Sequence, residues 1–251
     1  MGEWERGRAG LRCFRKAPAR SHARTLTISV ELGCHERARP LNTASHPDMS
    51  LYQRFFAHTL AWGDDAQHRL YGEHKRELFA DLEGTVVEIG PGTGVNLAYL
   101  PDGLRWIGLE PNPHMHGYIR DRLEDRDLDA TLRTDPAQDT GLPDDSVDTV
   151  ISTLVLCSVP DVEATLAELR RILRPGGRLL FIEHVAADRH TPLCWFQHGI
   201  RPLWKAVADG CHPDRDTATW LQQAGFSTVT FEKHRIGVPP VTPHIVGAAT
   251  K

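Results

Sequence analysis

The sequence lacks the features that mark several large classes of protein. Its 251 residues carry a formal net charge of only −4, so the charge gives no reason to expect nucleic acid or anionic lipid as a partner. No run approaches the roughly 18 consecutive apolar residues of a membrane-spanning helix, so no membrane span is expected. There is no internal repeat and no low-complexity segment. With 40% apolar and 25% charged residues, the chain is predicted to be globular with one α/β domain.

Cysteine is scarce as well. The five cysteines form no C-x-x-C pair and are odd in number, so their spacing predicts neither a metal site nor a disulfide framework. They are Cys13, Cys34, Cys157, Cys194 and Cys211. Unpaired cysteines are typical of a reducing compartment, and a cytoplasmic location is therefore expected.

The charge is distributed unevenly along the chain. Residues 1–48 hold nine Lys/Arg against five Asp/Glu, whereas the remainder holds 20 against 28. The first segment shows no helical or strand period, and its apolar stretch at Thr25–Val30 is too short for a signal peptide. Its arginines are compatible with a transit peptide, but its glutamates argue against one. We expect residues 1–48 to be a disordered tail or non-native extension, and residues 49–251 to form the functional domain.

From Leu51 onward, apolar residues recur at the spacings of helices and strands. Two amphipathic helices broken near Gly63 come first, and "RPGG" at 174–177 is interpreted as a turn. The alternation that follows predicts a parallel, doubly wound sheet. Strands are expected at 85–89, 104–110, 129–133, 147–154 and 178–185, and helices at 95–100, 114–124, 162–173 and within 191–211.

Three glycines stand at alternate positions directly after the first expected strand. In "VVEIGPGTGVN" they are Gly90, Gly92 and Gly94, and Glu88 precedes them. Glycine adopts positive φ readily and lets a ligand approach the main chain. A dinucleotide fingerprint needs a small residue three positions after its second glycine, and this chain has Val95 there. The pattern therefore disfavours a nicotinamide dehydrogenase; a tight turn without a ligand is the alternative to a binding loop.

A ligand crevice is predicted at the carboxyl ends of the strands, where the strand order reverses. Glu110 lies 20 residues after Gly90, at the end of the second expected strand. A carboxylate at this place can accept the hydroxyl protons of a ribose. The loop near 137–139 and Ser152–Cys157 are expected to border the same crevice.

These residues, together with "LRPGG" before a strand, resemble a class I S-adenosylmethionine-dependent methyltransferase. "STLVLCSV", "EHVA", "DGC" and "PHIVG" in the second half are similar to the methyltransferase-like 7 family of alkyl-thiol methyltransferases and its bacterial relatives. The resemblance runs from about Lys75 to Lys251. It implies a Rossmann-like seven-stranded sheet, mostly parallel with a C-terminal antiparallel hairpin, and S-adenosyl-L-methionine as cofactor.

The resemblance also implies roles for individual residues. Glu88 would lie near the ammonium group of the cofactor, the three glycines would line its methionine part, and Glu110 would hold the ribose. The family's adenine loop maps to Ala137 and Gln138, where its usual acidic residue is absent. Pro111 and Asn112 would flank the adenine, and Thr153 and Leu154 would face the sulfonium and the acceptor.

Methyl transfer asks little of protein side chains, because an in-line displacement needs mainly proximity and orientation, worth about 7–11 kcal/mol. A thiol of pKa about 8.5 needs only modest stabilisation of its thiolate, or a nearby base. The candidate polar residues are His184, His198, Asp209 and His212, with structural hydrogen bonding or helix capping as the alternative role. Cys157 lies in an apolar run and is interpreted as a small buried hydrophobe rather than a nucleophile.

The segment Thr191–Cys211 has one wide apolar face that includes Trp195, Phe196 and Trp204. It is either a helix packed in the core or a lid that presents an apolar wall to a lipophilic acceptor.

The sequence thus predicts a methyltransferase acting on a small, apolar acceptor, with thiol sulfur favoured by the resemblance. An N-, O- or C-methyltransferase of a quinone, lipid or secondary metabolite is the alternative enzyme. A cofactor-binding interaction protein without transfer activity is the alternative outside enzymes.

Overall fold

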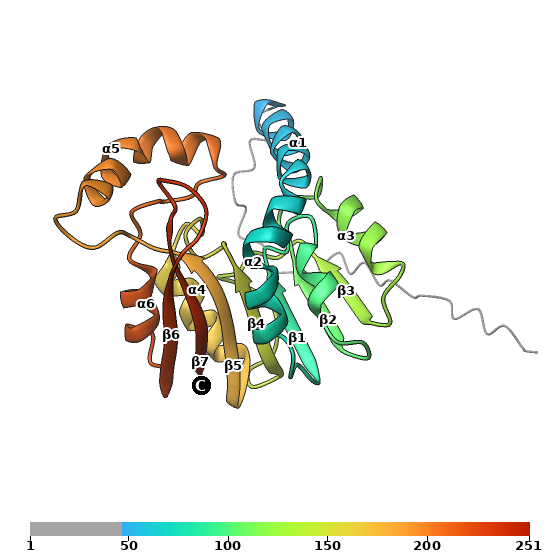
Figure 1. The fold of residues 1–251 in the computed structure, drawn as a ribbon. Coiled ribbons are helices and arrows are strands. Elements are labelled where there is room, and N and C mark those ends of the chain that lie inside the picture. Colours follow the sequence, from blue (N-terminus) through green and yellow to red (C-terminus); the bar gives the residue numbers. More distant parts are fainter. Residues whose placement is uncertain (1–46) are drawn as a thin grey trace, which may run out of the picture.

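Seven strands form one sheet with helices packed on both faces (Figure 1). The computed structural model describes residues 47–251. The strand order is β3-β2-β1-β4-β5-β7-β6, and β7 runs antiparallel to both of its neighbours. This arrangement confirms the predicted fold class. The strands are β1 (Thr85–Ile89), β2 (Arg105–Leu109), β3 (Asp129–Arg133), β4 (Val147–Thr153), β5 (Leu173–His184), β6 (Thr228–Arg235) and β7 (Pro243–Thr250).

The helices come before, between and after these strands, as the alternation in the sequence predicts. They are α1 (Pro47–Trp62), α2 (Asp64–Leu78), the 3-10 helix η1 (Val95–Tyr99), α3 (His116–Leu123), α4 (Val162–Ile172), α5 (Pro192–Val207) and α6 (Thr217–Gln223). The tail was expected at residues 1–48, of which residues 1–46 lie outside the described part of the chain. The first described element, α1, begins at Pro47.

The two faces of the sheet are buried in separate apolar clusters. Successive residues of a strand point to opposite faces, so helices on both sides bury both. Val86 packs in the cluster that contains Ile119 of α3. Val87 packs in the other, with Leu169 of α4 and Leu221 of α6. Each such side chain stabilises the fold by about 1.5–3 kcal/mol when fully buried.

The break between the first two helices lies at Gly63, as predicted. Asp64 opens α2, where a negative charge interacts favourably with the helix dipole. Its carboxylate accepts hydrogen bonds from the Thr93 hydroxyl at 2.7 Å and from Arg122 at 2.5 Å. The start of α2 is thereby fixed to the glycine-rich loop and to α3.

Three elements differ from the sequence prediction. The expected turn at Arg174–Gly177 is a bulge inside β5, because Val147 pairs with Leu173 while Thr149 already pairs with Arg178. The helix expected after the glycines is a 3-10 turn, in which Leu97 N–H bonds to Gly94 O. α6 was not predicted, since its seven residues are too few for a clear helical period.

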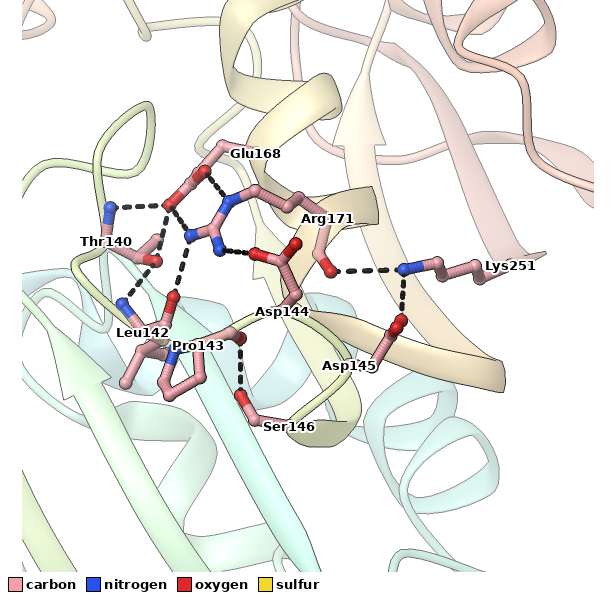
Figure 2. A network of polar contacts seen from close by, with 9 residues as sticks. All are labelled: Thr140, Leu142, Pro143, Asp144, Asp145, Ser146, Glu168, Arg171 and Lys251. Carbon is pink, nitrogen blue, oxygen red and sulfur yellow. Dashed lines mark hydrogen bonds and ion pairs between the residues drawn. The ribbon is translucent and has the colours of Figure 1, made fainter.

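A polar network fixes the connection from β3 to β4 against α4 (Figure 2). Glu168 accepts hydrogen bonds from the backbone N–H and the hydroxyl of Thr140 at 2.9 and 2.6 Å. Arg171 contacts Glu168 at 2.7 Å, donates to Leu142 O at 2.8 Å and pairs with Asp144. Hydrogen bonds from Arg171 lower the pKa of Glu168 to about 2.

We expect Arg171→Ala to lower the free energy of unfolding by about 1–2 kcal/mol, since charged hydrogen bonds are lost at a partly exposed site. Arg170→Ala, which removes an exposed arginine from the same helix turn, should change it by less than about 0.5 kcal/mol. Urea denaturation at pH 7 measures both.

The difference between wild type and Arg171→Ala should also shrink in acid. The pKa of Glu168 is depressed in the fold from its ordinary 4.5 to about 2, so its contribution is complete above about pH 5 and is lost as pH falls toward 2. A difference that stays constant from pH 7 to pH 3 would contradict the assigned role of the pair.

Candidate active site

The glycine-rich loop leaves the carboxyl end of β1 with three residues in the left-handed region. Gly90, Gly92 and Gly94 have φ values of 53°, 59° and 80°. A Cβ at Gly90 would lie 2.8 Å from Val155 Cγ2, and one at Gly92 would lie 3.0 Å from Leu60 Cδ2. The loop therefore needs glycine for its backbone conformation and for the close approach of its neighbours. It lies beside the point where the strand order reverses, between β1 and β4.

Glu110 ties this loop to the end of β2. Its carboxylate is buried and accepts hydrogen bonds from the backbone N–H groups of Gly92 and Asn112, both at 2.9 Å. Burial, together with the nearby charges of Asp209 and Glu88, raises the pKa of Glu110 to about 7, against the opposing effect of these two donors. A carboxylate has about four lone-pair sites, so each oxygen can still accept another donor.

Glu88 is buried at the end of β1 and links three elements. It accepts hydrogen bonds from Asn96 Nδ2 at 2.9 Å and from Trp106 Nε1 at 3.0 Å. Asn96 Nδ2 also donates to Thr153 Oγ1 at 3.0 Å. Burial raises the pKa of Glu88, against these donors. Asn96 Oδ1 is buried without a hydrogen-bond partner in the described chain, so Asn96, which sequence reasoning did not single out, offers an acceptor here.

A fully buried lysine was also missed. Lys75 of α2 donates to Gln67 at 3.3 Å, and its ammonium lies 5.6 Å from the Tyr99 ring centroid. Burial lowers the pKa of Lys75 to about 8, while the charge of Glu88 acts to raise it. In the sequence, Lys75 is one basic residue among several on an amphipathic helix, which is the pattern of a solvated face.

The two loops expected to hold an adenine differ in burial. Asn112 is buried, donates to Gln53 O of α1 at 3.2 Å and accepts from His114 N–H at 3.0 Å, whereas Pro111 is exposed. Ala137 packs in the core and Gln138 is exposed. Asn112 thus connects α1 to the end of β2.

The loop after β4 is shaped by a third buried carboxylate. Glu183 of β5 accepts hydrogen bonds from the Ser152 hydroxyl at 2.6 Å and from the backbone N–H groups of Val155 and Leu156 at 3.0 and 3.1 Å. Burial raises the pKa of Glu183, against the effect of these donors. Leu154 is held at a φ of 59°, a conformation that costs a non-glycine residue energy and needs such support.

Four side chains, those of His184, Cys211, Trp204 and Cys157, lie close together near the carboxyl end of β5. His184 Nε2 is hydrogen-bonded to Cys211 Sγ at 2.9 Å, and Trp204 Nε1 donates to the same sulfur at 3.2 Å. A hydrogen bond from Cys157 holds the pKa of Cys211 well below its usual range, with further contributions from His184 and Trp204. The same hydrogen bond and burial raise the pKa of Cys157.

The other polar candidates are placed differently. Asp209 has a φ of 46°, its backbone N–H donates to the Tyr52 hydroxyl at 3.0 Å, and burial raises the pKa of its carboxyl. His198 is exposed and hydrogen-bonded to Cys194 O of its own helix at 2.8 Å. The fold therefore places His184 beside Cys157 and Cys211, whereas His198 lies apart from these two cysteines. The backbone N–H of His212 donates a hydrogen bond to Cys157 O at 3.0 Å.

α5 lies beyond the carboxyl edge of the sheet, as does α1 (Figure 1). Only Cys194 and Gln197 of α5 are buried, while Trp195 and Phe196 are 69% and 47% exposed. A helix packed in the core, one of the two interpretations of this face, is therefore wrong. Trp204 is half-buried against Cys211. Within residues 47–251, no helix has both the length and the apolar content to cross a bilayer.

Comparisons with known proteins agree with this geometry. A family profile described as "Methyltransferase domain" matches residues 87–181. Thiol S-methyltransferase TMT1B of Homo sapiens is 36% identical over 80% of this chain and 88% of the relative. Thiol S-methyltransferase TMT1A of Homo sapiens is 36% identical over 70% of this chain and 78% of the relative.

Solved structures support the fold independently. A SAM-dependent methyltransferase from Thermotoga maritima has a TM-score of 0.57 at 23% identity, covering 80% of this chain and 98% of that one. At this identity, the likeness shows the architecture of the chain and not its acceptor.

The role of close packing at the glycine-rich loop can be separated from that of positive φ. We expect Gly90→Ala to destabilise the protein more than Gly103→Ala, by about 1–3 kcal/mol, in thermal or urea unfolding. Both positions have positive φ, but a Cβ at Gly103 meets nothing within 4 Å. Equal losses in the two variants would show that the contact with Val155 is unimportant.

Proposed function

Because the chain belongs to the thiol S-methyltransferase family of S-adenosylmethionine-dependent methyltransferases, we propose that it transfers a methyl group to the sulfur of a small, apolar thiol. The observation that carries this acceptor class is the 36% identity over 88% of a relative named for thiol S-methylation. A buried imidazole and two buried thiols near the carboxyl end of β5 support it. We assign the activity to residues 49–251.

We propose that S-adenosylmethionine binds along the ends of β1, β2 and β4. The glycines Gly90, Gly92 and Gly94 would contact its methionine part, and Glu110 its ribose. The free lone pairs of Glu110 and the unpartnered Asn96 Oδ1 fit donors of this kind. The further proposed contacts are Glu88 at the ammonium, Pro111, Asn112, Ala137 and Gln138 around the adenine, and Thr153 and Leu154 toward the methyl group.

We propose that the acceptor lies between the end of β4 and the segment that follows α5. When bound, the cofactor would supply an electrophilic methyl group. The acceptor thiol would release its proton to solvent, and its sulfur would form a bond to the methyl carbon as the sulfonium bond breaks. His184 and Asp209 would lie beside the acceptor sulfur, and Trp204 would form part of its wall. His198, hydrogen-bonded to its own helix, would support α5 instead.

A substrate panel tests the proposed acceptor class. The purified chain, with S-adenosylmethionine, is offered thiols, amines, phenols and quinones, and methylated products are detected by mass spectrometry. We expect methyl thioethers from apolar thiols. Methylation of another acceptor but no thiol would overturn the acceptor class, and tight binding without any product would favour a cofactor-binding interaction protein.

The affinity for S-adenosylhomocysteine should fall in acid because of Glu110. Ribose hydroxyls donate to the ionised carboxylate, so binding lowers a pKa that is about 7 in the free protein. The acids that face Glu110, Asp209 and Glu88, raise this pKa and do not reverse the sign. Calorimetry should show affinity decreasing by up to about tenfold per pH unit below pH 7.

Glu110→Gln should abolish this pH dependence and weaken binding at pH 8 by about 10- to 100-fold, or about 1.5–3 kcal/mol. Glu77→Gln, an exposed site on α2, is the matched control and should bind as wild type does. If Glu110→Gln retains both the affinity and its pH dependence, Glu110 does not contact the ribose.

Trp195→Ala tests α5 as a lid. Since Trp195 is 69% exposed, its loss should leave the melting temperature and cofactor affinity unchanged. The KM for bulky thiols should rise roughly three- to tenfold through lost apolar contact. Leu70→Ala, an apolar truncation on the surface of α2, should leave KM unchanged. An unchanged KM for Trp195→Ala would remove this residue from the acceptor site.

A further inference from the structure

Three side chains of types that bind metals, from separate parts of the chain, converge near the carboxyl end of β5. Cys157 follows β4, His184 ends β5 and Cys211 follows α5. One ligand atom from each lies within 4.8 Å of the other two, and all three side chains are buried. Spacing along the sequence predicts no metal site, because neighbouring members of the cluster are 27 residues apart and form no short motif.

The ligand types and their distances suit zinc. Two thiols and one imidazole are a set that zinc binds in sites with three protein ligands and one open position. Around a tetrahedral zinc ion, such ligand atoms lie about 3.5–3.8 Å apart. His184 Nε2 lies 2.9 Å from Cys211 Sγ, and all three ligand atoms lie within 4.8 Å of one another, so shifts of about 1 Å or less would bring them to these distances.

Groups outside the three ligands fit a metal-bound thiolate. Trp204 Nε1 already donates to Cys211 Sγ, and the Ser158 hydroxyl lies 3.5 Å from Cys157 Sγ. Outer hydrogen bonds of this kind orient metal ligands. Arg215, held by Leu156 O and Val159 O at 2.7 and 2.8 Å, is close enough for its charge to interact with both cysteines. Zinc with two thiolates is neutral, so a third, incoming thiolate would be balanced by this guanidinium.

We propose that Cys157, His184 and Cys211 bind a zinc ion whose open position takes the sulfur of the thiol acceptor. The fourth ligand rests on the proposed function, whereas the metal site itself does not. On binding zinc, the acceptor thiol releases its proton to solvent; its sulfur then forms the bond to the methyl carbon while the sulfonium bond breaks. The neutral thioether is a weaker ligand than the thiolate and leaves.

Metal content provides a test that does not depend on activity. The full chain, purified without chelator, should contain about one zinc per molecule by elemental mass spectrometry. Cobalt(II) added to the chelator-treated protein should give a thiolate charge-transfer band and intense visible bands typical of tetrahedral coordination. Cys157→Ser, His184→Ala and Cys211→Ser should each lose the zinc and the band.

Cys194→Ser is the matched control, because Cys194 is also buried and lies 3.7 Å from a histidine, His198, outside the cluster. It should keep the zinc. Retention of zinc in all variants, no zinc in wild type, or a Cys157–Cys211 disulfide in the native protein would each overturn the site. Affinity for S-adenosylhomocysteine and the melting temperature establish that each variant is folded. If the cluster variants unfold, wild-type stoichiometry and the cobalt spectrum decide.

Failure of the metal site and failure of the proposed function give different results. Zinc binding without methylation of any thiol would retain the site and overturn the acceptor class. Thiol methylation that persists unchanged in the zinc-free protein would retain the acceptor class and overturn the role of the metal.

Discussion

The geometry of the site depends on the burial of three carboxylates at the carboxyl ends of the parallel strands β1, β2 and β5. A buried carboxylate is costly unless donors surround it, and here most of the donors are in the loops of the site. Glu110 accepts hydrogen bonds from the backbone N–H groups of Gly92 and Asn112. Glu183 accepts them from two backbone N–H groups after β4. Glu88 accepts them from the side chains of Asn96 and Trp106. The loops after β1, β2 and β4 are therefore held in place by backbone hydrogen bonds to the carboxylates of Glu110 and Glu183.

Local patterns in the sequence were sufficient for most of the fold. The alternating elements and the break at Gly63 follow from residue periodicity and from glycine, and the structure confirms them. The bulge at Arg174–Gly177 was not predictable, because "RPGG" is compatible with a turn or a bulge and strand pairing decides between them. An apolar helix face likewise does not reveal whether it is covered, which is why α5 had two interpretations.

The residues of the candidate site likewise differ in how far the sequence could predict their positions. Glu88, Glu110 and the glycines are close together in sequence and form a recognisable spacing, so their positions at the carboxyl ends of β1 and β2 could be anticipated. The burial of Lys75 could not be anticipated, because the burial of a helical lysine depends on which side chains pack over it. His184 and His198 are indistinguishable as residue types, and only the fold places one beside Cys211 and the other in solvent.

α1 contacts the site from outside the sheet while contributing little to its core. Of its side chains from Leu51 onward, only Ala57 is fully buried. Its remaining connections include the Tyr52 hydroxyl at Asp209, Gln53 O at Asn112 and Leu60 near Gly92. Segments held by so few contacts open with free energies far below that of global unfolding. A local opening of α1 would therefore uncover Asn112, Gly92 and Asp209 while the sheet stays folded.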